Sequence, residues 1–163
     1  MKRFLTPVCL LAAIVAAATP ATAAPSGPPT AFTENGSLPA SVCGFPISYT
    51  LTGKTKVIKS PTGRTIITSP GQKITLVNEG TDASVSYVIT GVRRETLVDV
   101  PNTDVDTIET VVTGRNIVVN FESARPGLFV LIGEFNYAIN TNFEEVRVFS
   151  GNGQVIDICA ALD

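Results

Sequence analysis

The sequence predicts a single-domain, all-β protein built as an antiparallel β-sandwich, with a β-barrel as the alternative. Turn-forming residues recur at short intervals, and the glycines at positions 53, 63, 71, 80 and 91 are 8 to 11 residues apart. The segments between them are rich in Val, Ile, Thr, Phe and Tyr, which suit a pleated, half-buried surface. Several of these segments also alternate apolar and polar residues, as strands with one buried face do.

The chain begins with a segment typical of an export signal. Lys2 and Arg3 precede the apolar stretch "FLTPVCLLAAIVAAA", and Ala21-Thr22-Ala23 has the small residues of a cleavage site. We therefore expect a signal peptide over residues 1–23 and a secreted, extracellular protein. The apolar stretch is short for a membrane span, so stable membrane insertion is not expected.

Residues 24–39 are predicted to be a flexible lead-in, because "APSGPPT" is rich in Pro, Gly and Ser. Residues 40–163 would then form the β-sandwich domain. Without Lys2 and Arg3 the chain has ten basic and fourteen acidic residues, a net charge of −4. This mild acidity and the lack of a basic run argue against nucleic acid as a partner.

Strand-like alternation continues along the domain. In residues 83–90, Val85, Tyr87 and Ile89 fall on one face, with serines on the other. Residues 115–121 and 134–140 alternate in the same way, while "LFVLI" is apolar on both faces and predicts a central strand. No window after the leader has a capped apolar stripe of helical spacing, so we expect ten or eleven strands and no helix.

Thr-Gly pairs occur at four places, and two of them lie in "LTGKTKVIKSPTGRTIITSP". Gly-Lys-Thr is also the end of a nucleotide-binding P-loop, but that motif needs a glycine where this chain has Ser48. A helix should follow the loop as well, and "TKVIK" is strand-like. We interpret Gly53, Gly63, Gly91 and Gly114 as tight turns between strands, with cations at the strand starts.

Two cysteines follow the leader, Cys43 and Cys159, one near each end of the predicted domain. In an oxidising compartment they predict one disulfide bond, whose long loop would contribute about 5 kcal/mol in the chain-entropy model. Two free thiols or a metal-binding pair are the alternatives. A bridge would make the first and last strands neighbours, or place them face to face across two sheets.

The chain has no histidine, which excludes Ser-His-Asp and Cys-His catalysis and His-based zinc sites. Carboxylates could still hydrolyse glycosides, and Glu144-Glu145 or Asp104 with Asp106 are the candidates. Adjacent residues of a strand point to opposite faces, so solvated charges explain the glutamates better. The segment "DVPNTDVDTIE" offers a candidate calcium site at Asp99, Asp104, Asp106 and Glu109, although a negatively charged hairpin explains it better.

The phrases "GRTIITSPGQKITLVN", "VVTGRNIVV" and "GNGQVIDICAALD", with Cys43 upstream, resemble small secreted actinobacterial β-proteins of uncharacterised function. The likeness covers about residues 40–162. It implies an exported single-domain β-protein, and it carries over no active-site residue.

Together these observations predict a secreted, non-enzymatic binding or cell-envelope-associated protein with an extracellular or cell-wall partner and no cofactor. Its binding surface is expected on end loops, with "TDVDT" and "ESARPG" as candidates. A secreted hydrolase using carboxylates and a carrier of small apolar ligands are the alternatives. Without tryptophan, and with its three tyrosines in strand-like segments, the chain offers few exposed aromatic platforms for sugars.

Overall fold

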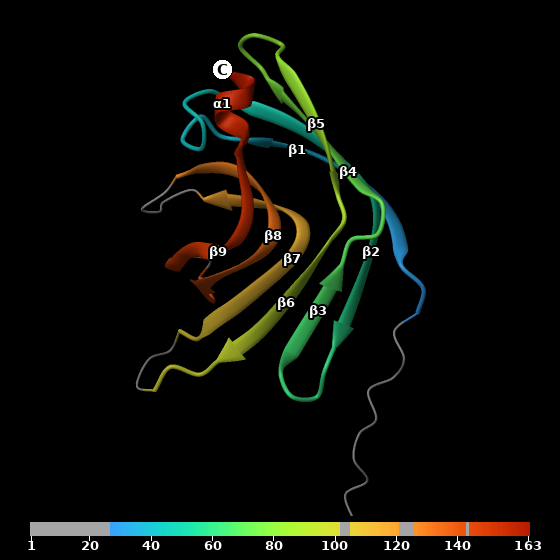
Figure 1. Cartoon of the computed structure of the whole chain (residues 1–163), viewed down its shortest axis with the longest axis vertical. Coiled ribbons are helices and arrows are strands. Elements are labelled where there is room, and N and C mark those ends of the chain that lie inside the picture. The colour runs from blue at the N-terminus through green and yellow to red at the C-terminus, as the bar shows by residue number, and fades with distance from the viewer. Residues whose placement is uncertain (1–26, 102–104, 121–125, 143) are drawn as a thin grey trace, which may run out of the picture.

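The computed structural model describes residues 27–101, 105–120, 126–142 and 144–163. Over these ranges the chain forms nine strands and one short helix, so the predicted all-β class is confirmed (Figure 1). The elements are β1 (Thr30–Leu38), β2 (Ile47–Lys59), β3 (Arg64–Thr68), β4 (Gln72–Asn78), β5 (Ser84–Ile89), β6 (Gly91–Val98), β7 (Thr107–Asn120), β8 (Gly127–Asn140), β9 (Glu145–Asp157) and α1 (Ile158–Leu162).

The strands form one antiparallel sheet in the order β5-β4-β2-β3-β6-β7-β8-β9, with β1 paired to β2 outside this path. Strand β2 is long enough to have two sets of neighbours. Its first part lies between β1 and β4, and residues 56–59 pair with β3. The sheet is not closed, because β9 pairs with β8 alone among the described strands. The barrel alternative is therefore not adopted.

The two ends of the sheet pack against each other, which gives the two layers of the predicted sandwich. Their main core joins Ile47 of β2, Leu76 of β4 and Ile89 of β5 to Val130 of β8. Helix α1, near the C-terminus of the chain, adds Ile158 and Leu162 to this core. These strands are far apart in the order of the sheet, so the contact requires the sheet to fold over.

A second core shows where β8 bends. Phe129 and Phe135 both pack on Phe149, at ring-centroid distances of 5.3 Å and 6.2 Å. The rings of Phe129 and Phe135 are therefore at most about 12 Å apart, whereas six residues of a straight strand would separate them by about 20 Å. Gly133 lies between these two phenylalanines, and Figure 1 shows β7 and β8 as strongly curved ribbons.

Glycines occupy one line across the curved strands. Gly91 pairs with Gly114, Gly114 with Gly133, and Gly133 with Gly153. At Gly133 φ is 136°, and a Cβ there would lie 2.3 Å from the carbonyl oxygen of Asn152. Only glycine fits such a conformation and so close an approach, so this row allows the bend.

The structure corrects the interpretation of the Thr-Gly pairs. Gly53 lies inside β2, Gly114 lies inside β7, and Gly91 begins β6. Only Gly63 belongs to a tight turn, in which its amide donates to the Ser60 carbonyl at 3.2 Å. Glycine thus bends strands here more often than it ends them, so the described chain has nine strands instead of the ten or eleven expected.

The expectation of no helix is wrong at the C-terminus. Helix α1 has only five residues, too few for a periodic pattern. The Asp157 side chain caps it by accepting from the Ala160 amide at 3.1 Å, and Ile158 and Leu162 are fully buried in the main core. Asn78 of β4 also donates to the Leu162 carbonyl at 2.9 Å.

Cys43 and Cys159 are joined as the sequence predicts, with Cα atoms 5.1 Å apart. Neither lies in a strand, and the bridge does not make the first and last strands neighbours in the sheet. Cys43 lies in the turn between β1 and β2, and Cys159 lies in α1. The bridge ties this turn to the helix, and both cysteines pack against the main core.

Strand β1 begins at Thr30, so regular structure starts within the predicted lead-in over residues 24–39 and not at residue 40. The predicted signal peptide over residues 1–23 lies outside the described residues. Along the described chain, no helix has the length and apolar character needed to cross a membrane.

Candidate functional site

The outer surface of β1, β2, β4 and β5 carries a broad grouping of uncharged polar side chains. Alternate residues of these strands, such as Ile47, Leu76 and Ile89, point into the main core, so the residues between them face outward. The pairing places nine such residues on one face, which we call the hydroxyl face: Thr33, Asn35, Ser37, Ser48, Thr50, Thr52, Thr75, Ser84 and Ser86.

One line of the hydroxyl face crosses all four strands. Asn35 pairs with Thr50, Thr50 with Thr75, and Thr75 with Ser86. The Thr50 hydroxyl donates to Asn35 Oδ1 at 2.8 Å, and the hydroxyls of Thr75 and Ser86 are 2.8 Å apart. Neighbouring strands are about 4.8 Å apart, so the face presents hydrogen-bonding groups at a regular spacing.

The hydroxyl face contains a shallow depression of about 270 Å³ at β1, β2 and β4. Ser48, Thr50, Thr75 and Val77 line it, together with residues 35–36 of β1 and Tyr49. No carboxylate occupies the cross-strand rows that make up this face, and Lys73, opposite Thr52, is exposed on it. Lys54, opposite Ala31, is exposed beside it, so the surface carries two cations and no carboxylate, although the chain as a whole is acidic.

The inner side of β1 is fixed by one contact. The Tyr49 hydroxyl donates to Glu34 Oε1 at 2.8 Å, and this bond to a carboxylate raises the pKa of Tyr49 above its ordinary value. The ring passes over Gly36, where a Cβ would come within 2.7 Å of three ring and hydroxyl atoms. Glu34 is therefore directed away from the hydroxyl face and held against β2.

A second polar group lies beside the aromatic core of β7 to β9. Tyr137 is half-buried, and it pairs across the sheet with Thr110, whose side chain is fully buried. Burial raises the pKa of the Tyr137 hydroxyl, while the positive charge of Arg93 acts in the opposite direction. Arg93 also forms an ion pair with Glu95 at 2.9 Å. These contacts satisfy a polar group at the edge of a core, which is a structural role.

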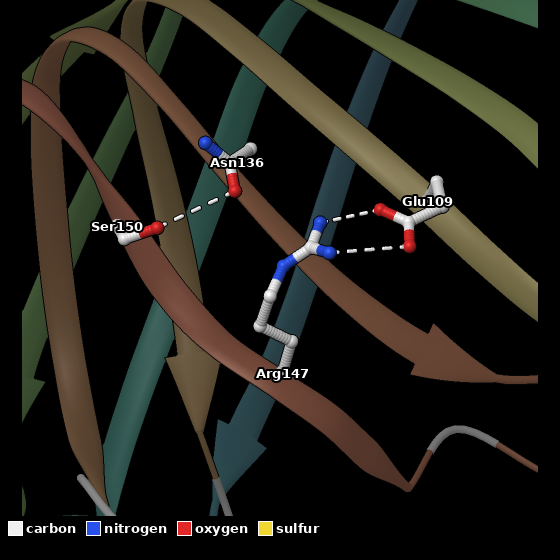
Figure 2. Close-up of polar contacts among 4 residues, drawn as sticks. All are labelled: Glu109, Asn136, Arg147 and Ser150. Carbon is white, nitrogen blue, oxygen red and sulfur yellow. Dashed lines mark hydrogen bonds and ion pairs between the residues drawn. The ribbon is translucent and has the colours of Figure 1, made fainter.

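Glu109, a candidate calcium ligand, has a partner of its own. Figure 2 shows its carboxylate, on β7, facing the guanidinium of Arg147, on β9; strand β8 lies between these two strands. The two groups make two hydrogen bonds, one of them 3.2 Å long. Ser150 donates to Asn136 Oδ1 beside them, at 3.4 Å. Both charged side chains are more than a third exposed, so the pair contributes about 1 kcal/mol or less to stability.

The other predicted acidic residues are not gathered into a site by the described structure. Asp104 lies outside the described residues, and Asp99 and Asp106 are in the connection between β6 and β7. The described residues contain no group of three or more Cys, Asp or Glu side chains that could hold a metal ion. Calcium binding in this segment therefore stays a prediction without a geometric basis.

The other candidates from the sequence are Glu144 and the two predicted binding loops. Glu144 accepts a hydrogen bond from the Asn140 side-chain amide at 2.6 Å, so it stabilises the turn between β8 and β9. Of the two predicted binding loops, "ESARPG" lies mostly and "TDVDT" partly outside the described residues. The described part of the molecule therefore gives a strand surface, and not a loop cluster, as the candidate site.

Sequence reasoning missed the hydroxyl face, although a signal for it was present. Ser, Thr or Asn residues alternate with other residues in "TAFTENGSL" and "ISYTLT", and Ser84 and Ser86 do so in β5. Each segment alone indicates only a strand with a solvent-facing side. The shared face depends on which strands pair and in what register, and this is known only from the fold.

Comparisons with known proteins give no match to a protein-family model, a curated protein or a solved structure. The candidate function therefore rests on the geometry of this chain.

Proposed function

We propose that this protein is an exported, non-enzymatic binding protein that holds a neutral, hydroxyl-rich polymer of the cell envelope on its hydroxyl face. One observation carries the proposal: Asn35, Thr50, Thr75 and Ser86 form a hydrogen-bonding line across four strands, on a face without carboxylates. The expected leader and the disulfide between Cys43 and Cys159 support export.

The class of ligand follows from the chemistry of the face. Hydroxyls act as donors and as acceptors, and the Asn35 amide adds two donors and an acceptor. A polysaccharide offers the same pair of functions along its length, whereas a basic partner would need carboxylates here. Each neutral hydrogen bond contributes only about 0.5–1.5 kcal/mol, so a repeating ligand that uses several of them fits best.

The absence of an aromatic platform from the hydroxyl face limits the affinity that we expect. Tyr49 comes closest, but its hydroxyl is bonded to Glu34 and its ring packs over β1. Binding would then depend on hydrogen bonds to an ordered, flat surface, and would be weak for one sugar unit. A long polymer compensates, because it engages many positions at once.

A depletion assay tests the proposal. The processed chain, residues 24–163, is mixed with insoluble envelope polysaccharide from the producing cell, with cellulose as a neutral glucan and with polygalacturonate as an anionic polymer. We expect binding to the envelope polysaccharide, and weaker binding to the anionic polymer than to cellulose. The double variant Thr50→Val/Thr75→Val keeps both β-branched shapes and removes two hydroxyls, so it should bind at least about fivefold more weakly.

Thr96→Val/Thr113→Val is the matched control, because it removes two hydroxyls from β6 and β7 and should bind normally. If the first variant is unstable, Ser48→Ala/Ser84→Ala replaces it. Equal binding by wild type and both hydroxyl-face variants, or binding to none of the three polymers, would refute the proposed function.

A further inference from the structure

The sheet has three described edges, and two of them are protected. Strand β9 is irregular beside β8, with register shifts around Ala138, and it carries Arg147 and Asp157. Strand β5 has only six residues and lies against α1, and Arg115 Nη1 donates to the Val88 carbonyl at 3.4 Å. Bulges, charges, short length and cover are the devices by which edges avoid pairing with other chains.

Strand β1 has only one of these devices, the charge of Glu34. It pairs with β2 alone, over nine residues in one unbroken register from Thr30 to Leu38. It contains no proline, lysine or arginine, and most of its residues are exposed. Its single charged residue, Glu34, is bound to Tyr49 on the inner side. Its outer edge is therefore a regular row of backbone donors and acceptors, ready to accept another strand.

The sequence of β1 is complementary to itself about Asn35. If two copies meet edge to edge with Asn35 opposite Asn35, antiparallel pairing places Thr33 opposite Ser37 and Phe32 opposite Leu38 of the second copy. Glu34 then faces Gly36, so no like charges oppose each other. Polar residues meet polar residues on the outer side, and on the inner side Phe32 meets Leu38.

We propose that the protein forms a two-fold symmetric homodimer through β1, with the edges of the two strands paired about Asn35. Pairing of this kind is isologous and closes on itself, so it gives a dimer and not a fibre. It joins the strands β5, β4, β2 and β1 of each copy into one continuous surface of eight strands. The two hydroxyl faces become a single face on one side of that surface.

This inference does not depend on the ligand, and it is tested by molecular mass. Light scattering during gel filtration of the processed, oxidised chain should give twice the mass of one chain. The double variant Thr33→Lys/Ser37→Lys puts lysines opposite one another at both ends of the paired segment. We expect it to elute with the mass of one chain and with unchanged circular dichroism.

A charge-reversed variant makes the test specific. Thr33→Glu/Ser37→Glu should also be monomeric alone, but an equal mixture of the two variants should recover the dimer mass, because unlike charges then face each other. The control Ser84→Lys/Val88→Lys adds the same charge on exposed residues of β5 and should stay dimeric. A monomeric wild type, a dimeric lysine variant at Thr33 and Ser37, or a mixture that stays monomeric would overturn the proposal.

Discussion

Gly133 and Gly153 face each other where β8 and β9 bend, and each lies against the backbone of the other strand. A Cβ on Gly153 would lie 2.1 Å from the Ile132 carbonyl oxygen. Each of these two residues therefore combines a positive φ with a close approach of the neighbouring strand. The second core, around Phe149, depends on the bend that they allow.

Gly133→Ala should lower the free energy of unfolding by about 2–4 kcal/mol, because the new methyl group meets backbone that cannot move aside. Urea denaturation measures the loss. Gly63→Ala is the control: its φ is also positive, at 75°, but nothing lies within 4 Å of the added Cβ. It should cost about 1 kcal/mol. Equal losses for the two variants would contradict the role assigned to close approach.

Tyr137 leads to a prediction about alkaline pH. Its folded-state pKa is raised, chiefly by burial, so the unfolded chain loses this proton at a lower pH than the folded chain does. The stabilising contribution is complete below about pH 10 and is lost as the pH rises through the folded pKa. Urea denaturation between about pH 9 and 11 should show stability falling, and falling less in Tyr137→Phe. An identical pH dependence in the variant would count against this assignment.

At the scale of elements, α1 and the turn before β2 act together as a lid over the main core. Leu162 and Ile158 are fully buried, and the disulfide joins the helix to the turn that contains Cys43. The sequence predicts the bridge from the positions of two cysteines. It does not predict the helix, because five residues held by Asp157 and by core contacts leave no periodic signal.

Leu162→Ala should cost about 2–5 kcal/mol, because it leaves a cavity under the lid. Val88→Ala, at an exposed position, should change stability by less than about 0.5 kcal/mol. Thermal unfolding followed by circular dichroism distinguishes the two variants. A loss at Leu162 as small as that at Val88 would mean that α1 is not part of the core.

Breaking the disulfide should lower the melting temperature as well. The chain-entropy model gives an upper value of about 5 kcal/mol for a loop of this length. Cys43→Ala/Cys159→Ala should melt below the oxidised wild type and at about the temperature of the reduced wild type. An unchanged melt after reduction, with the fold intact, would contradict the stabilising role of the bridge.

At the scale of the whole molecule, the all-β class and the two-layer packing could be predicted from alternation and from β-branched composition. The order and curvature of the strands could not be predicted, because a glycine in the sequence can lie in a turn between strands, as Gly63 does, or inside a curved strand, as Gly114 does. That choice depends on the neighbouring strands. The hydroxyl face could not be predicted either, because its residues come from four strands and only the fold determines how these strands pair.

Dimerisation through β1 and polymer binding on the hydroxyl face would reinforce each other. A dimer through β1 would double the area of the hydroxyl face and let one polymer chain contact both copies. Linked sites raise the apparent affinity well above that of either site. Weak single contacts without an aromatic platform would then suffice for retention on an insoluble polymer.

The most direct test of the central claim is a chemical-shift map of the isotopically labelled, processed chain, titrated with soluble oligosaccharides released from the envelope polysaccharide. The account predicts that the amide signals that move belong to β1, β2, β4 and β5, with Asn35, Thr50 and Thr75 among the largest changes. Changes confined to β7, β8 and β9, or no change at saturating oligosaccharide, would contradict it.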